Sequence, residues 1–376
     1  MKIRSCITAL LGASTVAGVT ITQDTTTSGA VDFSLGVTVA PGVKYSIWNN
    51  AVSAIAGSLN VGSGGGFYIS SDNPLLGLSV TLLGVVNTIT NNGVVSFNSV
   101  VSATAPTYNL VGASFTNNGQ VYFSSKGSIF PGVQSITSST WNNNGLISIY
   151  QESRSTGAVV LGPALGDLNN NGNICLYNQI WIQTGNVKGN GCWQILGDSL
   201  AQLNLPASPI DTTQVFYMGG PDSELLATLV TASQTYTVAG FGNGNFIGLT
   251  GPILSWNYNS GTGVLTLYSG VFNTLPQRFL IGPNYVQSKF STTSHIFSGV
   301  SAPLNNAIVY NAAPPNPKPA KCGVCTSTVA APKPTSSSST STKPTTAPTT
   351  APTTAPTTAP TTAPTTAPTT EGFLGQ

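Results

Sequence analysis

The sequence predicts an all-β protein in which a parallel β-helix is followed by a second strand-rich domain and a Thr/Pro-rich stalk. Three observations predict this organisation: a strand-like repeat of about 26 residues, an irregular series of further strands, and a tandem low-complexity tract near the end. The 376 residues are enough for two globular domains with flanking segments.

The repeat places Asn-Asn-Gly before a short alternating strand four times, and a weaker copy follows. The first four glycines lie 26, 26 and 27 residues apart, and the five corner glycines are Gly93, Gly119, Gly145, Gly172 and Gly191. Because Asn-Gly is typical of tight turns, we expect these glycines to supply positive φ angles. Apolar residues fall two and four positions after each glycine, at Val95/Phe97, Val121/Phe123, Ile147/Ile149, Ile174/Leu176 and Trp193/Ile195.

Period-two alternation puts each of these pairs on one face of its strand. A unit this small cannot bury its own apolar face, so successive copies must stack, with coils about 4.8 Å apart and the pairs inside. A leucine-rich repeat has a similar period, but its Leu-x-x-Leu-x-Leu frame is absent. We therefore predict a parallel β-helix over residues 19–198.

Beyond Asp198 the period disappears while strand-like runs separated by turn signals continue. This pattern predicts a small antiparallel β-sandwich over residues 199–326. The runs are 214–218, 225–230, 235–238, 253–258, 264–268 and 278–281. Residues 327–376 are rich in Ser, Thr and Pro, with six Thr-Thr-Ala-Pro units at 345–368. We expect a disordered stalk that carries O-glycans.

The first 18 residues are typical of a signal peptide, with Lys2 and Arg4 before an apolar stretch and small residues for cleavage. The stretch is too short and too polar for a membrane span. Charged residues make up only 6% of the chain, and residues 19–311 carry six basic and nine acidic groups, a net of 6 − 9 = −3. The sequence therefore predicts a secreted protein with no membrane span, and it excludes nucleic acid as a partner.

Four cysteines remain after removal of the signal peptide: Cys175, Cys192, Cys322 and Cys325. Cys175 and Cys192 fall at outward positions of the repeat, offset by two residues and one coil, which puts their Cα atoms about 8 Å apart and beyond the reach of an unstrained disulfide. We expect them to pair with Cys322 and Cys325 and so tie the later segment to the β-helix. The alternative is a Cys322–Cys325 bridge.

The sequence predicts no catalytic, cofactor-binding or metal site, and therefore no enzyme. A β-helix polysaccharide lyase or hydrolase, the competing possibility, would need clustered carboxylates on one outer face. Glu152 and Arg154 fit a solvated surface pair, Glu224 follows Asp222 in an expected turn, and His295 has no expected carboxylate neighbour. Outward aromatic residues such as Tyr122, or the Asn-rich corners, are candidates for contact with glycans or hydrophobic surfaces.

In its ordered landmarks, residues 19–326 resemble the N-terminal domain of the hyphally regulated cell wall proteins of yeasts, the Hyr/Iff and adhesin-like wall proteins. The landmarks are the Asn-Asn-Gly coils, Trp141–Ile147, Asn171–Leu176, Lys188–Cys192, Phe241–Asn245, Gly248–Thr250 and the closing cysteines Cys322 and Cys325. The resemblance implies a right-handed β-helix followed by an α-crystallin-like sandwich, joined by disulfides. It carries no catalytic residues.

The resemblance further implies a secreted, adhesin-like protein of the fungal cell wall or cell surface, with roles in adhesion, biofilm or wall organisation. The expected partners are cell-wall polysaccharide and host or abiotic surfaces. The alternative is a structural or shielding wall glycoprotein with no defined ligand. Wall-anchored members end in a GPI signal with an apolar tail, whereas this sequence ends Thr370–Gln376 without one. A soluble form and a fragment of an anchored protein both remain open.

Overall fold

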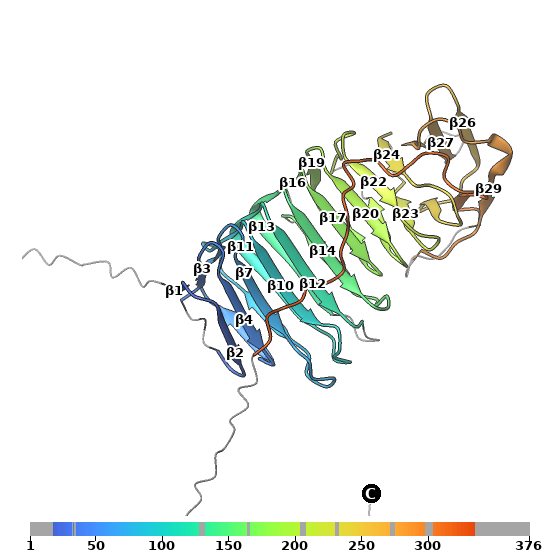
Figure 1. Ribbon diagram of the computed structural model, residues 1–376. Coiled ribbons are helices and arrows are strands. Elements are labelled where there is room, and N and C mark those ends of the chain that lie inside the picture. The colour runs from blue at the N-terminus through green and yellow to red at the C-terminus, as the bar shows by residue number, and fades with distance from the viewer. Residues whose placement is uncertain are drawn as a thin grey trace, which may run out of the picture. The chain divides into compact units, whose positions relative to one another are not determined.

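The computed structural model describes residues 18–334 except 32, 34, 128–131, 164–165, 204–207, 230–232, 271–274 and 298–303 (Figure 1). The predicted signal peptide up to residue 17 and the stalk from residue 335 lie outside the described residues. The described part consists of strands with one 3-10 helix, η2 (Gln287–Lys289), and no α-helix. The all-β prediction is therefore confirmed.

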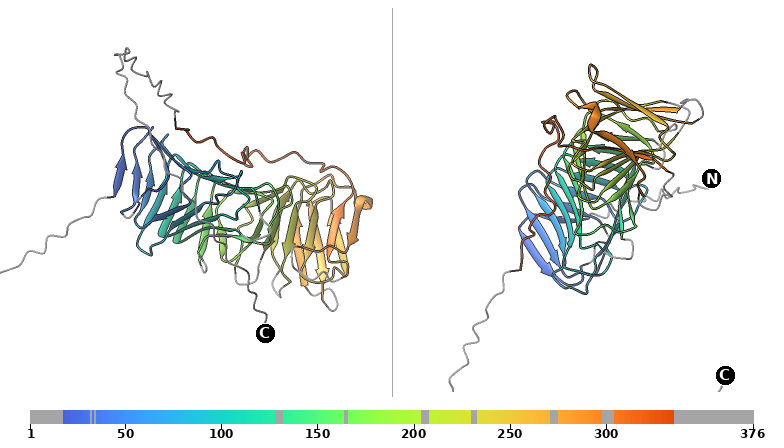
Figure 2. Two further views of the ribbon diagram at one scale, coloured as in Figure 1. Left: turned by 90° about the horizontal axis from the view of Figure 1, so that it is seen from below. Right: turned by 90° about the vertical axis from the view of Figure 1, so that its right-hand side faces the viewer.

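Most of this part winds into stacked coils whose strands lie on three faces, numbered here in the order the chain meets them (Figure 2). The third face belongs to a 13-stranded sheet. Its strands pair in parallel in chain order. They are β2 (Thr25–Ser28), β4 (Lys44–Trp48), β7 (Gly66–Ser70), β10 (Val94–Ser99), β12 (Gln120–Ser125), β14 (Leu146–Gln151), β17 (Asn173–Tyr177), β20 (Cys192–Leu196), β22 (Val215–Met218), β24 (Thr235–Ala239) and β28 (Leu275–Leu280).

The first and second faces form a single 17-stranded sheet, because two long strands, β11 (Thr107–Asn117) and β13 (Val133–Asn143), run through both. The first face also holds β5 (Val52–Ile55), β8 (Ser79–Leu82), β15 (Ala158–Leu161), β18 (Ile180–Ile182), β21 (Leu200–Leu203), β23 (Glu224–Ala227) and β25 (Phe246–Leu249). The second holds β1 (Val19–Ile21), β3 (Val37–Val39), β6 (Leu59–Val61), β9 (Thr88–Asn91), β16 (Asp167–Asn170) and β19 (Asn186–Lys188).

The core between the three faces contains the predicted inward pairs. Val95, Val121, Ile147, Ile174 and Trp193 are in register on adjacent third-face strands. Phe97, Phe123, Ile149, Leu176 and Ile195 form the second such row, and no member of either row is more than 1% exposed. The prediction of stacked coils with these side chains inside is confirmed.

The corner glycines serve a different purpose from the one expected. None of Gly93, Gly119, Gly145, Gly172 and Gly191, all within the described residues, has a positive φ. A Cβ on Gly119 would instead lie 2.1 Å from the carbonyl oxygen of Gly93, and one on Gly145 would lie 2.0 Å from that of Gly119. The corners therefore need glycine because the backbones of neighbouring coils approach too closely for a side chain, and the positive-φ interpretation was wrong.

The asparagines before each glycine form two ladders along this corner. In the inner, buried ladder the amide of Asn91 donates to Asn117 at 2.8 Å, Asn117 to Asn143 at 2.7 Å, and Asn143 to Asn170 at 2.8 Å. The outer ladder runs the opposite way along the exposed second asparagines, from Asn144 to Asn118 to Asn92. Because buried amides need partners, the inner ladder fixes the register of successive coils.

The parallel stacking does not stop at Asp198. β20, β22 and β24 continue the third face, and β21, β23 and β25 continue the first, all in parallel. The strands expected after residue 198 are present, but for residues 199–249 the expected antiparallel arrangement was wrong. These coils lack Asn-Asn-Gly, and on the third face the spacing between paired residues is 23 for Trp193↔Phe216 and 22 for Phe216↔Val238, instead of 26 or 27.

Antiparallel pairing begins at β25, which pairs in parallel with β23 and antiparallel with β30 (Ala307–Tyr310). β26 (Ser255–Asn259) pairs with β27 (Val264–Ser269), which pairs with β28, while β30 also pairs with β29 (Phe290–Thr293). Aromatic side chains fill the interior here, with Tyr285 and Tyr310 rings 4.7 Å apart and Phe290 and Tyr310 rings 5.0 Å apart. These strands cap one end of the coil stack (Figure 1).

Candidate binding surfaces

After β30 the chain turns back and crosses the third face as an extended strap, defined here as residues 311–334 (Figures 1 and 2). Near the cap, the amide of Asn316 donates to the carbonyl oxygen of Pro283 at 2.9 Å. At the other end, the carbonyl oxygen of Pro332 accepts hydrogen bonds from Ser46 Oγ and Trp48 Nε1, both at 2.7 Å. The strap thus passes from β28 to β4, and residues 327–334, expected to begin the stalk, belong to it.

Two disulfides fasten the strap. Cys175 on β17 bonds to Cys325 and Cys192 on β20 bonds to Cys322, with Cα–Cα distances of 6.0 and 5.2 Å. Cys175 and Cys192 are offset by two residues on adjacent strands, as the repeat predicted. Because the bonds span 150 and 130 residues, each is expected to stabilise the fold by about 4–5 kcal/mol through the unfolded chain.

The strap buries side chains that the repeat places on the outside of the third face. Tyr122, expected to be an exposed contact residue, is only 3% exposed, and its hydroxyl lies 3.0 Å from Thr326 Oγ1. Ser148 Oγ donates to the carbonyl oxygen of Thr326, and Ser124 Oγ to that of Ser327. Tyr122 is therefore not available to a ligand, and that expectation is corrected.

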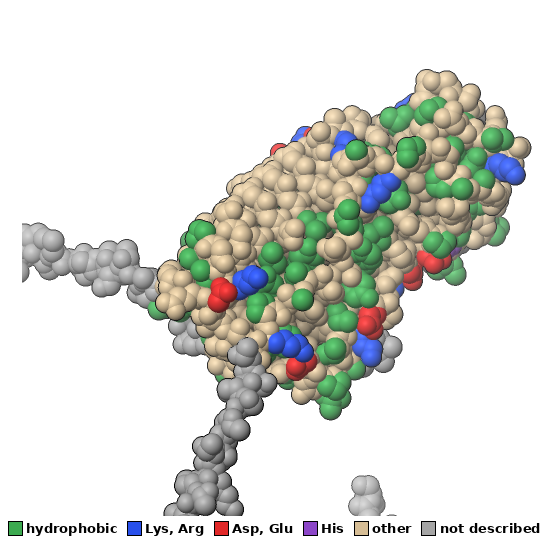
Figure 3. Space-filling view, viewed as in Figure 1, with side chains coloured by type: hydrophobic (Ala, Val, Ile, Leu, Met, Phe, Trp, Pro, Cys, Tyr) green, Lys and Arg blue, Asp and Glu red, His purple; other side chains and the backbone are tan. Residues whose placement is uncertain are grey.

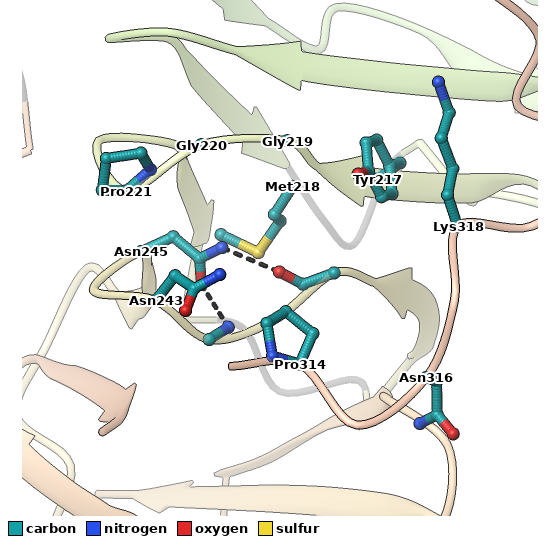
Figure 4. Close-up of a pocket in the computed structure, with 12 residues that line it drawn as sticks. Tyr217, Met218, Gly219, Gly220, Pro221, Asn243, Asn245, Pro314, Asn316 and Lys318 are labelled. Carbon is teal, nitrogen blue, oxygen red and sulfur yellow. Dashed lines mark hydrogen bonds between the residues drawn. The ribbon is translucent and has the colours of Figure 1, made fainter. Parts of the chain in front are cut away.

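A pocket of about 340 Å³ lies between the turns that follow β22 and β24 and the strap (Figure 4). Asn245 holds the second turn in shape, because its side chain accepts a hydrogen bond from Gly242 N and donates to Gly240 O. The lining residues are Tyr217, Met218, Gly219, Gly220, Pro221, Gly240, Gly242, Asn243, Asn245, Pro314, Asn316 and Lys318.

The pocket offers amides, one aromatic ring and one amine, and its lining includes no carboxylate. Glycines flank the ring, since a Cβ on Gly240 would come within 3.0 Å of Tyr217 Cε2. The ammonium of Lys318 lies 5.0 Å from the centre of that ring and donates to Gly323 O at 2.9 Å. Burial lowers the pKa of Lys318. Because a cation already covers the ring, the surface on which a sugar would stack is occupied.

Four ionisable side chains form a cluster on the first face around Glu224. Arg154 forms two hydrogen bonds to Glu224, at 3.1 and 3.3 Å, and a further ion pair with Asp198. Burial alone would lower the pKa of Arg154, but these hydrogen bonds and charges raise it. His295 Nε2 lies 2.9 Å from Glu224, and its ring stacks on Phe246 at 3.7 Å.

This cluster corrects three expectations. Arg154 pairs with Glu224 and Asp198 rather than with Glu152, and Glu224 lies in β23, not in a turn. His295 does have a carboxylate neighbour. Arg154 follows β14, Asp198 precedes β21 and His295 follows β29, so the cluster ties successive coils to the cap. Glu224 is 5% exposed and already partnered, an arrangement suited to holding structure rather than to proton transfer.

Within the described ranges no group of three or more His, Cys, Asp or Glu side chains is placed to hold a metal ion. Cys322 and Cys325, which have the spacing of a CxxC motif, are each committed to a disulfide. The same part of the chain has no helix of the length and apolar character needed to cross a membrane.

Apart from the two cysteines, the strap residues that contact the coils were not predicted from the sequence. Lys321 donates to Thr213 O at 2.7 Å, and Gly323 N to the side chain of Asn173 at 2.9 Å. Such contacts have no periodic signal, because each is a single hydrogen bond rather than part of a repeated strand ladder. The expected disulfides from Cys175 and Cys192 to Cys322 and Cys325 were the one sequence feature that indicated the strap.

Comparison with known proteins agrees with the coil pattern and the cysteines. The family model described as "Hyphally regulated cell wall protein N-terminal" matches residues 9–332. Among curated proteins of Candida albicans, Hyphally regulated cell wall protein 3 is 40% identical over 85% of this chain and 26% of its own length. Cell wall protein RBR3 is 38% identical over 85% of this chain and 21% of its own length.

Cell wall protein IFF4, from the same organism, is 39% identical over 90% of this chain and 22% of its own length. The chain thus spans about a fifth to a quarter of each of these three relatives. The matched region covers the coils, the cap and nearly the whole strap. The chain therefore belongs to the hyphally regulated cell wall protein family, as a member with the N-terminal domain of these wall proteins.

Proposed function

We propose that the coiled unit is a non-catalytic adhesive head at the fungal cell wall, carried on the O-glycosylated stalk that follows it. The observation that carries this proposal is the disulfide-fastened strap. It returns the chain across the coils, so the chain leaves the described unit beside β4, at the end opposite the cap. A pull on the chain beyond Pro334 reaches the disulfides after only a few strap contacts.

A head that bears load in this way suits adhesion. Between Cys325 and Pro334 the strap is held mainly by single hydrogen bonds, each contributing about 1 kcal/mol, whereas breaking a disulfide requires covalent chemistry. Tension would therefore be transferred to β17 and β20, in the middle of the coil stack. A structural or shielding protein without a ligand has less need of such a clasp.

The non-catalytic part of the proposal follows from the charges. Hydrolysis or lyase chemistry needs titratable groups free to reach a substrate. In the described chain the main cluster, around Glu224, is internally paired, and the pocket beside the strap has no acid in its lining.

The test uses beads coated with the full secreted chain, applied to yeast cells, epithelial cells and polystyrene under flow. We expect the beads to attach and to resist shear, and a reducing agent that opens both disulfides to lower the shear at which they detach. The chain should release no new sugar ends from wall polysaccharides. Failure to attach to any surface at high bead coating would favour the shielding alternative, and measurable turnover of polysaccharide would refute the non-catalytic role.

A further inference from the structure

The second face carries an ordered array of short, uncharged polar side chains. In three successive coils, the outward positions of the second-face strands and the adjoining corner are all Thr, Ser or Asn. We call this array the polar lattice, and its members are Thr88, Thr90 and Asn92; Ser114, Thr116 and Asn118; and Thr140, Asn142 and Asn144.

Backbone register aligns these side chains in rows. Thr88, Ser114 and Thr140 pair directly across β9, β11 and β13, as do Thr90, Thr116 and Asn142. The third row is the outer asparagine ladder, whose side chains bond to one another at 2.8 Å. Strand geometry sets the rows about 6.6 Å apart along each strand and the coils about 4.8 Å apart.

The scaffold beneath the lattice is rigid. The residues between the lattice positions point inward, and Ile89, Phe115 and Trp141 are each no more than 1% exposed. The rings of Phe115 and Trp141 pack 5.1 Å apart. The inner asparagine ladder lies beside them, so the spacing of the lattice is fixed by both apolar packing and buried hydrogen bonds.

The lattice is open to a partner. Thr90, Thr116 and Asn142 have no side-chain hydrogen-bond partner among the described residues, and Asn92, Asn118 and Asn144 are exposed. The strap crosses the third face, and within the described residues it makes no hydrogen bond to the lattice side chains. In Figure 3, the border of the molecule along which β3, β11, β13 and β16 lie is mostly neither apolar nor charged.

The absence of charge within the lattice selects the partner. An anionic or cationic polymer would find no counter-charge at these nine positions, whereas hydroxyl and amide groups both donate and accept hydrogen bonds. A rigid array with a strand-like repeat matches a rigid polymer with a similar repeat. In chitin, chains are hydrogen-bonded through their acetamido groups much as strands are through peptide groups, so its amides repeat at a spacing close to that of the coils.

We propose that the polar lattice binds the ordered surface of chitin, through its threonine hydroxyls and asparagine amides. The proposal rests on the proposed function, because it names a polymer that a wall-exposed head would meet. Three rows on three coils cover only about 250 Å². A stable protein interface buries about 800 Å² on each partner, so a single head binds weakly and attachment depends on many heads on one polymer surface.

The test measures co-sedimentation of the full secreted chain with crystalline chitin, and with cellulose and β-1,3-glucan as comparison polymers. The wild type should bind chitin best. The double variant Thr90→Lys/Thr116→Lys puts two charges and two long side chains on the lattice, and it should weaken binding at least about tenfold. Thr81→Lys is the matched control, because Thr81 is a half-buried outward threonine on β8, on the first face of the same coil as Thr90.

Thr81→Lys should bind chitin like the wild type. Thr90→Ser/Thr116→Ser keeps the hydroxyls with little change of shape, so it should retain most of the chitin binding. The proposal is overturned if the wild type does not sediment with chitin, if cellulose binds equally well, or if the lattice and control lysine variants behave alike. Bead adhesion without chitin binding would count against the lattice alone, and chitin binding without bead adhesion against the adhesive role alone.

Discussion

Replacing Gly119 with alanine tests whether the Asn-Asn-Gly corners are fixed by contact between coils or by backbone conformation. The added Cβ would lie 2.1 Å from the carbonyl oxygen of Gly93 and 2.8 Å from its nitrogen. An ordinary carbon–oxygen contact is about 3.3 Å or more, so the two coils must separate locally by about 1 Å. The same carbonyl accepts the hydrogen bond of Gln120 N at 2.8 Å, which that movement would weaken.

Overpacking of this kind costs about 1–3 kcal/mol and a weakened backbone hydrogen bond about 1 kcal/mol, so we expect a loss of about 3 kcal/mol. For a domain of about 300 residues, whose unfolding entropy is about 2.1 cal/mol/K per residue, that lowers Tm by about 5 °C. The matched control is Gly42→Ala. Gly42 has a φ of +73° and nothing within 4 Å of an added Cβ, so alanine there meets only the backbone penalty, about 1 kcal/mol.

Thermal unfolding followed by circular dichroism decides between the two explanations. Inter-coil contact predicts that Gly119→Ala lowers Tm about three times as much as Gly42→Ala. Equal losses, or a larger loss for Gly42→Ala, would refute the reasoning and restore the view that the corner glycines matter for their conformational freedom.

Two further predictions concern buried polar groups. Asn117→Ala removes the centre of the inner ladder, so Asn91 loses one of its two acceptors and the side-chain oxygen of Asn143 loses its donor. We expect a loss of about 2–4 kcal/mol, against less than about 1 kcal/mol for the exposed Asn118→Ala; similar Tm values for the two variants would contradict the ladder argument. Burial raises the pKa of Tyr108, Tyr236 and Tyr285 above the ordinary 10.0, so these side chains stay neutral in the folded protein at a pH where they ionise in the unfolded chain. Their contribution to the free energy of unfolding is complete below pH 10 and is lost as the pH rises above it, by about 4 kcal/mol per pH unit for the three together. Urea unfolding free energies that agree at pH 9 and pH 11 would show the prediction to be wrong.

The part of the fold that the sequence predicted is the part with a short, repeated signal. Val95, Val121 and Ile147 stack as expected because one motif recurs at one spacing, and a period of two leaves no choice of face. The same argument placed Cys175 and Cys192 on the outside and out of reach of each other. Neither inference required knowledge of long-range contacts.

The coils after Asp198 escaped prediction for a physical reason. Parallel stacking needs a register between strands, but it does not need Asn-Asn-Gly: Trp193 pairs with Phe216, and Phe216 with Val238, at spacings of 23 and 22. Glycine is required at a corner only where the backbones of two coils come into close contact. Corners without such contact therefore carry no repeated glycine in the sequence. The next interval, from Tyr236 to Phe279, is 43 residues because the β26–β27 hairpin is inserted, so the sequence shows no regular coil spacing there.

The charge cluster was hidden because its members are far apart in sequence. Arg154 and Glu224 come from two different coils and His295 from the cap, and spacing alone could not bring them together. Proximity along the chain favoured Glu152 as the partner of Arg154. In the stacked coils, however, Glu224, 70 residues away in the sequence, lies within hydrogen-bonding distance of Arg154. In a solenoid, a charged residue is best paired with candidates about one coil away or more.

The outward side chains of each face also explain where the strap lies. On the third face, outward positions include Trp48, Tyr68 and Tyr122, whose aromatic rings would be exposed to water without a cover. The strap leaves these three no more than 8% exposed and gives Trp48 and Tyr122 hydrogen-bond partners. The second face, with its hydroxyls and amides, can remain in water without such a cost. A strap on the second face would instead cover the polar lattice and leave these aromatic rings exposed to water. The strap therefore lies on the face whose outward side chains need to be buried.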